Sequence, residues 1–264
     1  MKVLLLGAAG VMGSDFIEEY KNNKNYSNFY ELILGVHRKR VEENFESRNV
    51  DLSDVESLKS SLKGIDVIVN LAGNPNPSAE FKDLIEPNIM GVHNLFEAAK
   101  EAKCKRIIIA SSVHAIKGYP EEKKVSESDS PMPKNAYGAS KAFGETLCSV
   151  FSKDLSCFAI RIGLYLSNNK NDTSQRSVSS QKEVICLNRE DLEYALTQRD
   201  MAQLIHKSIV APLSLKYAIL HGSSNNKNKK MNIDITKKLI GYEPEDDAFM
   251  ICGEIKQNIK TLNK

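Results

Sequence analysis

The sequence lacks the features that mark membrane-bound, secreted and nucleic-acid-binding proteins. Its 264 residues include 36 basic and 34 acidic side chains, so the net charge of +2 provides little attraction for nucleic acid or an anionic membrane surface. No apolar run approaches the roughly 20 residues that cross a bilayer. A strand is predicted to begin at Lys2, which leaves no room for a signal peptide. We therefore expect a cytoplasmic protein without nucleic-acid or membrane partners.

Cysteine is also scarce, and its spacing excludes two common ways of stabilising a small fold. The five cysteines are scattered, odd in number and free of any Cys-x-x-Cys pair. That pattern argues against a disulfide framework and against a structural zinc site. We expect reduced thiols that mostly pack in the core, and no metal site.

Short apolar runs rich in β-branched residues alternate with amphipathic segments of helix length. This alternation predicts an α/β fold, a Rossmann-like doubly wound parallel sheet with helices on both faces. The predicted strands are Val3–Leu6, Leu32–Val36, Val67–Asn70, Arg106–Ser111, Cys157–Ile162 and Tyr217–His221, with a weaker one at Ser47–Val50. The predicted helices are Val11–Asn22, Asp54–Leu62, Glu80–Lys103 and Tyr137–Asp154.

The chain length fits one Rossmann-type domain over residues 1–264, in which 164–200 and 222–264 contribute a small C-terminal substrate-binding part. Two segments break the alternation, a polar loop at Pro120–Lys134 and a stretch at Ser167–Lys182 that has almost no large apolar residues. Long loops after the carboxyl ends of parallel strands carry substrate contacts in such folds. For the second segment, a mobile insertion is an equally good interpretation.

A glycine motif follows the first strand. The chain reads Gly7-Ala-Ala-Gly10-Val11-Met12-Gly13 and then enters an amphipathic helix. Glycine allows the sharp turn and the close approach of the backbone to a pyrophosphate, while the first amides of the helix bind its charge. We expect Gly7, Gly10, Val11, Met12 and Gly13 to bind a dinucleotide.

The second strand ends without the acidic residue that would hold a ribose 2′-hydroxyl. It ends instead in Gly35-Val-His37-Arg38-Lys39-Arg40, which offers Arg38, with Arg40 or Lys39 in support, to a 2′-phosphate. NADP is therefore favoured, and the alternative is a solvated basic turn with NAD held by other residues. Asp51, followed by Leu52, is placed to accept a hydrogen bond from the adenine amino group. Asp51 could equally cap the helix that starts near Asp54.

A candidate catalytic group follows the strand that ends near Ser112. Tyr137 comes 25 positions after Ser112 and opens a helix as Tyr137-Gly-Ala-Ser-Lys141. Residues four apart share one helix face, so the ammonium of Lys141 can stabilise a Tyr137 phenolate for general acid/base catalysis. Ser112 can hydrogen-bond the same substrate oxygen. The alternative is a tyrosine at a helix start with a solvated lysine.

The order of these motifs resembles the extended short-chain dehydrogenase/reductase superfamily, also called the NAD-dependent epimerase/dehydratase family. The resemblance covers nearly the whole chain and rests on the glycine motif, Asp51-Leu52, Asn70-Leu-Ala-Gly73, Asn88-Ile-Met-Gly-Val-His-Asn-Leu, Ser112, Tyr137, Lys141 and Arg161-Ile-Gly163. It implies a cofactor site that includes Leu71, Ala72, Gly73, Asn88, Tyr137, Lys141 and Ile162. Asn88 would also support the active-site hydrogen bonds, unless it is a cap or turn residue beside Pro87. Homodimers that pair helices 80–103 and 137–154 are common in this family.

Within the family the chain is most similar to uronate dehydrogenases and related short sugar dehydrogenases. The likeness lies in Ser111-Ser-Val-His114, Gly118-Tyr-Pro, the segment from Tyr137 to Glu145 and Leu239-Ile-Gly-Tyr-Glu-Pro-Glu-Asp246. It implies oxidation of an anomeric hydroxyl to a lactone, with Asn74, Ser112 and His114 as substrate contacts. Two polar substrate contacts of that subgroup are replaced by Val113 and Leu164, and its carboxylate-binding arginine has only Arg176 and Arg189 as candidates.

The sequence therefore predicts an NAD(P)-dependent dehydrogenase or reductase that acts on a sugar or sugar-like substrate. One alternative is an epimerase or dehydratase of a nucleotide-sugar that keeps its cofactor tightly bound. Another is a non-catalytic NAD(P)-binding regulatory protein, because a fold alone does not establish a function.

Overall fold

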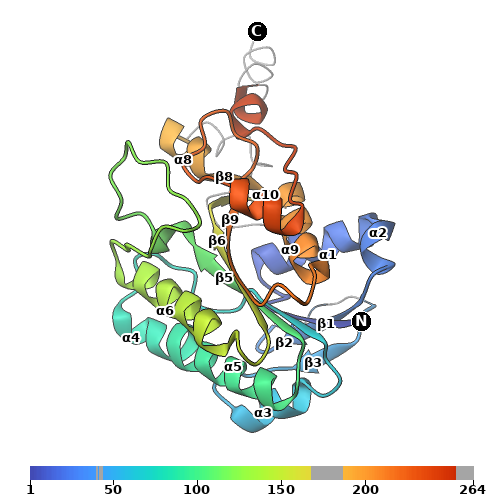
Figure 1. Cartoon of the computed structure of the whole chain (residues 1–264). Helices are drawn as coiled ribbons and strands as arrows, with labels where there is room; N and C mark the ends of the chain where they lie inside the picture. Colours follow the sequence, from blue (N-terminus) through green and yellow to red (C-terminus); the bar gives the residue numbers. More distant parts are fainter. Residues whose placement is uncertain (40, 42–43, 168–186, 254–264) are drawn as a thin grey trace.

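The computed structural model describes residues 1–39, 41, 44–167 and 187–253, and within them a parallel sheet forms the centre of the molecule (Figure 1). Its seven strands lie in the order β3-β2-β1-β4-β5-β6-β9. They are β1 Lys2–Leu6, β2 Glu31–Val36, β3 Ser47–Asn49, β4 Val67–Asn70, β5 Arg106–Ser112, β6 Ser156–Ile162 and β9 Tyr217–Gly222. The strand order reverses between β1 and β4, and ligands bind at such a switch point in open parallel sheets.

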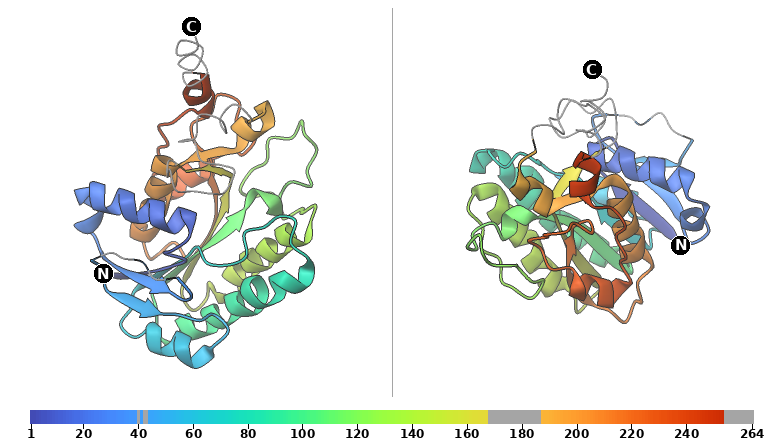
Figure 2. Two further views of the ribbon diagram at one scale, coloured as in Figure 1. Left: turned by 180° about the vertical axis from the view of Figure 1, so that it is seen from behind. Right: turned by 90° about the horizontal axis from the view of Figure 1, so that it is seen from above.

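Helices cover both faces of the sheet (Figure 2). One face carries α1 (Val11–Asn22) and α9 (Gln198–Val210), and the other carries α3 (Val55–Ser61), α5 (Gly91–Glu101) and α6 (Ala136–Phe151). Of the helices in the described part of the chain, none is long and apolar enough to cross a membrane. The predicted α/β, Rossmann-like fold class is confirmed.

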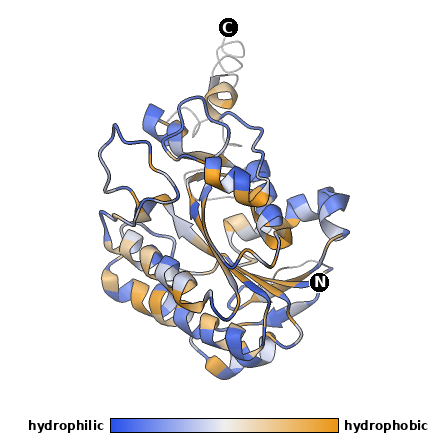
Figure 3. Cartoon of the chain, viewed as in Figure 1, coloured by the Kyte–Doolittle hydropathy of each residue, from blue (hydrophilic) through white to orange (hydrophobic). Residues whose placement is uncertain are grey.

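The strands are continuous apolar runs because both of their faces are buried. In β1, Val3 and Leu5 pack under α1 and α9, whereas Leu4 and Leu6 pack under the helices of the opposite face. All four side chains are at most 2% exposed. Figure 3 shows the result, a hydrophobic sheet between helices that carry both polar and apolar residues.

One predicted helix is divided in the structure. The segment predicted as a single helix over Glu80–Lys103 consists of α4 (Phe81–Leu84), a π-helix (Ile85–Met90) and α5. Pro87 lies inside the π-helix. A proline has no amide hydrogen and clashes with the carbonyl of the preceding turn, and a wider local turn accommodates both effects.

Several elements were not predicted. The helix α9 is the largest, and a second sheet pairs β7 (Leu164–Leu166) with β8 (Ala195–Thr197). The remaining ones are short: α2 Lys24–Ser27, α8 Arg189–Tyr194 and α10 Asp234–Ile240. The second sheet follows directly from the carboxyl end of β6. The division of the chain into a Rossmann-type body and a small substrate-binding part stays a prediction.

A buried arginine ties α9 to the sheet. Arg106 is fully buried at the start of β5, and its pKa is lowered to about 10 by burial. Its guanidinium donates to the carbonyl oxygens of Ser208, Ile209 and Ala211 at 2.7–3.0 Å, and to that of Pro212 at 2.8 Å. The last carbonyls of a helix have no partner within the helix and carry partial negative charge. Arg106 therefore caps the carboxyl end of α9 from inside the protein.

We expect Arg106→Met to lower the free energy of unfolding by about 3 kcal/mol or more, because methionine fills part of the space but leaves several buried carbonyls unpaired. Urea denaturation followed by circular dichroism measures this change. Arg189→Met is the matched control, since the Arg189 side chain is 74% exposed. Its effect should stay below about 1 kcal/mol. Equal losses in the two variants would contradict the capping role.

Candidate active site

The glycine motif forms a tight turn between β1 and α1. Gly7 has a φ of +78°, and a Cβ atom there would lie 2.8 Å from the amide nitrogen of Ala72. A Cβ atom at Gly13 would lie 2.2 Å from the carbonyl oxygen of Gly7. Gly10 is the N-cap of α1 and has no side chain to cover the first amides, which include those of Val11 and Met12. The turn therefore leaves the N-terminus of α1 open to an anion.

The end of β4 lies against this turn, on the other side of the switch point. The side chain of Asn70 accepts a hydrogen bond from the Ala72 amide at 3.0 Å, which folds the chain through Leu71, Ala72 and Gly73 beside Gly7. Gly73 has a φ of +140°, and a Cβ atom there would lie 2.8 Å from Oδ1 of Asn88. The predicted cofactor residues of β1 and β4 thus lie together.

The basic end of β2 is exposed, and it lies next to Asp51. Nε2 of His37 is 3.3 Å from Oδ2 of Asp51, and Arg38 and Lys39 are exposed beside it, while Arg40 lies outside the described residues. Two hydrogen bonds from Ser53 lower the pKa of Asp51, and the charges of His37 and Arg38 lower it further.

The alternative interpretation, in which Asp51 caps α3, is wrong. The cap is Asp54, whose carboxylate accepts from the amides of Glu56 and Ser57 at 3.0 and 3.1 Å. Leu52 lies on the inner side of this segment, where its carbonyl oxygen accepts from the Asn94 side chain at 3.1 Å. Asp51 therefore keeps a carboxylate at the edge of the predicted adenosine site.

The three predicted catalytic residues lie on two elements that pack against each other, at the end of β5 and the beginning of α6. Ser112 is the last residue of β5, and Tyr137 lies in the first turn of α6. Lys141 lies one turn further on, with its Nζ atom 3.0 Å from the carbonyl oxygen of Ala110 and 5.6 Å from the centre of the Tyr137 ring. Burial lowers the pKa of Lys141 to about 8. An ammonium so poorly hydrated interacts strongly with a neighbouring phenol.

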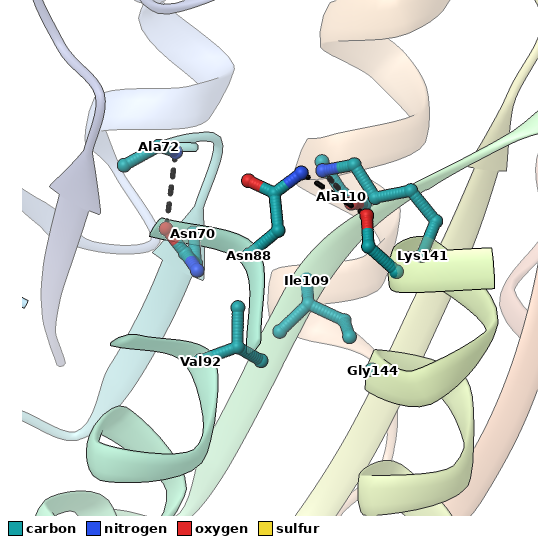
Figure 4. A pocket seen from close by; sticks show the side chains of 9 residues that line it. Asn70, Ala72, Asn88, Val92, Ile109, Ala110, Lys141 and Gly144 are labelled. Atoms are coloured by element: carbon teal, nitrogen blue, oxygen red, sulfur yellow. Dashed lines mark hydrogen bonds between the residues drawn. The ribbon is translucent and has the colours of Figure 1, made fainter. Parts of the chain in front are cut away.

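Asn88 joins the loop after β4 to the catalytic helix (Figure 4). Its Oδ1 atom accepts from the Asn74 amide at 2.8 Å, and its Nδ2 atom donates to the Asn74 carbonyl and to Oγ of Ser140, both at 3.1 Å. Ser140 in turn donates to the Tyr137 carbonyl at 2.7 Å. Asn88 lies inside the π-helix rather than at its cap, so the cap interpretation is wrong. Sequence reasoning missed Ser140, although it lies within the Tyr137–Lys141 motif.

His114 lies against the tyrosine. The two rings meet edge to face with centres 5.5 Å apart, and the Asn135 side-chain amide lies 3.2 Å from Nδ1 of His114. Asn135 also caps α6 by accepting from the Gly138 amide at 2.7 Å, so its amide nitrogen faces His114 as a donor. His114 is half-buried, and its role as a substrate contact stays a prediction. Sequence reasoning missed Asn135. The signal that could have found it is a residue type that often caps helices, placed just before the predicted helix.

The other predicted substrate residues are less directly placed. The Asn74 side chain accepts from the Asn76 amide at 3.0 Å and lies 3.3 Å from the Asp83 carbonyl, so both of its polar ends already have contacts. Val113 packs into an apolar cluster with Ile116, Val125 and Met231. Ile162 ends β6, and Leu164 lies in β7.

Two features of the predicted substrate side lie outside the described residues, namely Arg176 and nearly all of Ser167–Lys182. Arg189 is described, and it is exposed and paired with Glu193 at 3.0 Å. In the described part of the chain, no cluster of three or more His, Cys, Asp or Glu side chains is arranged to hold a metal ion.

A small cavity lies beside Lys141, between β4, β5 and the helices that cover them. Its lining residues are Asn70, Ala72, Asn88, Val92, Ile109, Ala110, Ser140, Lys141 and Gly144. Polar groups from the ends of β4 and β5, the π-helix and α6 thus converge on one point next to the carboxyl end of β4.

Comparison with known proteins agrees with this arrangement. Residues 3–182 match the model of the NAD dependent epimerase/dehydratase family. The chain is 29% identical to an L-arabinose 1-dehydrogenase (NAD(P)(+)) of Haloferax volcanii, over 95% of this chain and 98% of that protein. It is 26% identical to an NAD-dependent glucose-6-phosphate dehydrogenase of the same organism, over 96% and 97% of the two chains.

Solved structures extend the comparison to the fold. The crystal structure of uronate dehydrogenase from Agrobacterium tumefaciens superposes with a TM-score of 0.79 and 26% identity, and covers 97% of this chain and 88% of that one. These matches confirm the predicted family, the Rossmann-like fold and an NAD(P)-dependent oxidoreductase. The chain belongs to the NAD dependent epimerase/dehydratase family.

Proposed function

We propose that this protein is an NAD(P)-dependent dehydrogenase that oxidises the anomeric hydroxyl of a sugar or sugar-like substrate, with Ser112, Tyr137 and Lys141 as its catalytic residues. The observation that carries the proposal is the buried ammonium of Lys141, fixed 3.0 Å from the Ala110 carbonyl and next to the Tyr137 ring. Further support is that its Nζ atom lies 3.9 Å from the position a Cβ atom would take at Gly73. Gly73 belongs to the loop that packs against the glycine turn, where a dinucleotide binds in this fold.

The residues have complementary roles in the proposed reaction. Tyr137, as phenolate, removes the proton of the substrate hydroxyl, and Lys141 stabilises the phenolate charge. Ser112 accepts a hydrogen bond from the His114 amide at 3.2 Å, and its own hydroxyl would donate to the substrate oxygen. When bound, a nicotinamide would accept the hydride that the carbon loses, while the oxygen loses its proton to Tyr137 as the carbonyl forms.

The names of the relatives support a sugar as substrate, since they include arabinose, glucose 6-phosphate and uronate dehydrogenases. We therefore favour a free sugar or a sugar phosphate. An epimerase or dehydratase would keep its reduced cofactor bound through the reaction, and a regulatory protein would turn over nothing, so release of reduced nicotinamide distinguishes the dehydrogenase from both alternatives.

We propose NADP as the preferred cofactor, with NAD as the alternative. The support is the exposed basic group after β2, where Arg38 and Lys39 are open to a 2′-phosphate and the sequence from Gly35 to Arg40 contains no acidic residue. Asp51 lies 3.3 Å from His37 and would contact the adenosine from the β3 side.

We also propose a homodimer that pairs the α4–α6 side of the molecule. Four large apolar side chains are exposed there, Phe81, Ile85, Met90 and Val150, with 40–59% of their surfaces accessible. Large apolar side chains exposed on one side of a protein favour association with a partner. The cytoplasmic location expected from the sequence stays a prediction.

We expect Tyr137→Phe to reduce turnover by about 10²–10⁴-fold, because phenylalanine keeps the ring but cannot transfer a proton. Cofactor affinity should stay within about twofold of wild type. The assay screens aldoses, sugar phosphates and uronates with NAD or NADP and follows the absorbance of reduced nicotinamide. Tyr26→Phe makes the same chemical change at a buried tyrosine of α2, away from the site, and should keep its activity. Unchanged turnover in Tyr137→Phe would remove Tyr137 from the mechanism.

A second prediction concerns the cofactor. Arg38→Ala should weaken NADP binding by about tenfold or more, which is the order expected when a charge-assisted hydrogen bond to a phosphate is lost. NAD binding to the same variant is the internal control and should change little. Titration of each nucleotide by calorimetry gives both constants. A parallel loss for NAD and NADP would show that Arg38 does not read the 2′-phosphate.

A further inference from the structure

Successive residues of β5 hold α6 in register. The carbonyl oxygen of Ala110 accepts from Lys141 at 3.0 Å, and Oγ of the next residue, Ser111, donates to Oε1 of Glu145 at 2.6 Å. The residue after that is Ser112. Lys141 and Glu145 follow Tyr137 at steps of four, so all three lie on one face of α6. The proposed catalytic residues are therefore interleaved with a second set of contacts between the same two elements.

Glu145 binds a second strand as well. Nε of Arg161 donates to Oε1 at 2.9 Å and Nη2 donates to Oε2 at 2.9 Å, which makes a bidentate ion pair. Arg161 lies opposite Ser111 in the register of β5 and β6. The side chains of Arg161 and Glu145 are only 1% and 3% exposed. One carboxylate on α6 is thus fixed to the ends of both strands by charge-assisted hydrogen bonds, which are strong and directional.

The Arg161 guanidinium also has hydrogen-bonding partners other than Glu145. Nδ1 of His221 lies 2.7 Å from the Asn232 carbonyl, which can only accept, so Nδ1 carries the proton. Nε2 is then the acceptor for Nη1 of Arg161 at 3.4 Å. Burial, with the nearby Arg161 charge, lowers the pKa of His221 to about 3 and keeps it neutral. Nη2 of Arg161 also donates to the Asp129 carbonyl at 3.1 Å, so the guanidinium cannot turn away from Glu145.

We propose that Ser111 and Glu145 are positioning residues for catalysis, which fix α6 on β5 so that Tyr137 and Lys141 face Ser112. This role rests on the proposed function. A displacement of α6 along β5 would have to break the contacts of Glu145 with Ser111 and Arg161 together. The Lys141 ammonium is hydrogen-bonded to the Ala110 carbonyl of β5, whereas α6 carries the Tyr137 ring, so a shift of α6 along β5 would change the distance between the ammonium and the phenol.

A role in stability alone would give a different result from a role in positioning. Lost stability lowers the amount of folded enzyme and leaves each folded molecule unchanged. Lost positioning changes kcat per folded molecule and alters the pH dependence, because a phenol further from the ammonium holds its proton more tightly. Ser111 is the better site for the test, since replacing Glu145 would leave the buried charge of Arg161 without its partner.

The experiment compares Ser111→Ala with wild type in the oxidation direction. We expect kcat per cofactor-binding site to fall about tenfold, within the range that misplacement by about 1 Å produces. KM and the cofactor dissociation constant should stay within about twofold. The acidic limb of the kcat profile should move to higher pH by about half a unit or more. Ser111→Thr, which keeps the hydroxyl, should recover most of both changes.

Ser208→Ala is the matched control, because Ser208 is also fully buried and donates to a helix carbonyl, that of Leu204, at 2.7 Å. It should leave kcat and its pH profile unchanged. If the wild-type protein oxidises a sugar and Ser111→Ala has the same kcat and pH profile, the positioning role is overturned and the proposed function stands. A wild-type protein that oxidises no sugar with either nucleotide would overturn the proposed function, and the positioning role with it.

Discussion

The proposed chemistry depends on one buried ammonium group. Lys141 donates a hydrogen bond to the Ala110 carbonyl, and its pKa falls to about 8 because burial penalises the charge. A charge in such surroundings acts on its neighbours with little screening. The phenol of Tyr137 is the neighbour that benefits, since its ionised form offsets the cost of burying Lys141. The surrounding structure has to hold these two groups together at the strand end.

The backbone of β1, β4, the π-helix and α6 determines most of this arrangement. The switch of strand order between β1 and β4 opens a site at their carboxyl ends, and glycines allow the chain to pass close to itself there. Gly13 and Gly73 have no space for a side chain, because a Cβ atom would meet the Gly7 carbonyl and the Asn88 side chain, respectively. The π-helix then aims Asn88 at both the β4 loop and α6. The cofactor side and the catalytic side are thereby parts of one hydrogen-bonded unit.

The parts of the structure that follow from the local pattern of residues could be predicted from the sequence. The central strands are apolar on both faces, and the glycine turn and the Tyr137–Lys141 spacing are visible as motifs. The π-helix could not be predicted, because the apolar spacing of Glu80–Lys103 resembles an ordinary helix and only Pro87 hinted at a break. The strands β7 and β8 have three residues each and show no periodicity of their own. The helix α9 had signals that were overlooked, a Thr197 cap and apolar residues from Met201 to Ile209. The pair of Glu145 and Arg161 depends on tertiary contact, which spacing cannot reveal.

The same reasoning explains why the reaction is better defined than its substrate. The proposed reaction residues lie on β5 and α6, whose positions are fixed by buried contacts on several sides. Substrate contacts are expected from loops and from the second sheet, where side chains alone decide what is recognised. Val113, just beyond β5, is 5% exposed and packs with Val125 and Met231, so its side chain serves the core and offers a bound sugar no hydrogen bond. Recognition of the sugar is thereby left to side chains outside the contacts that hold β5 and α6 together, which explains why those contacts do not define it.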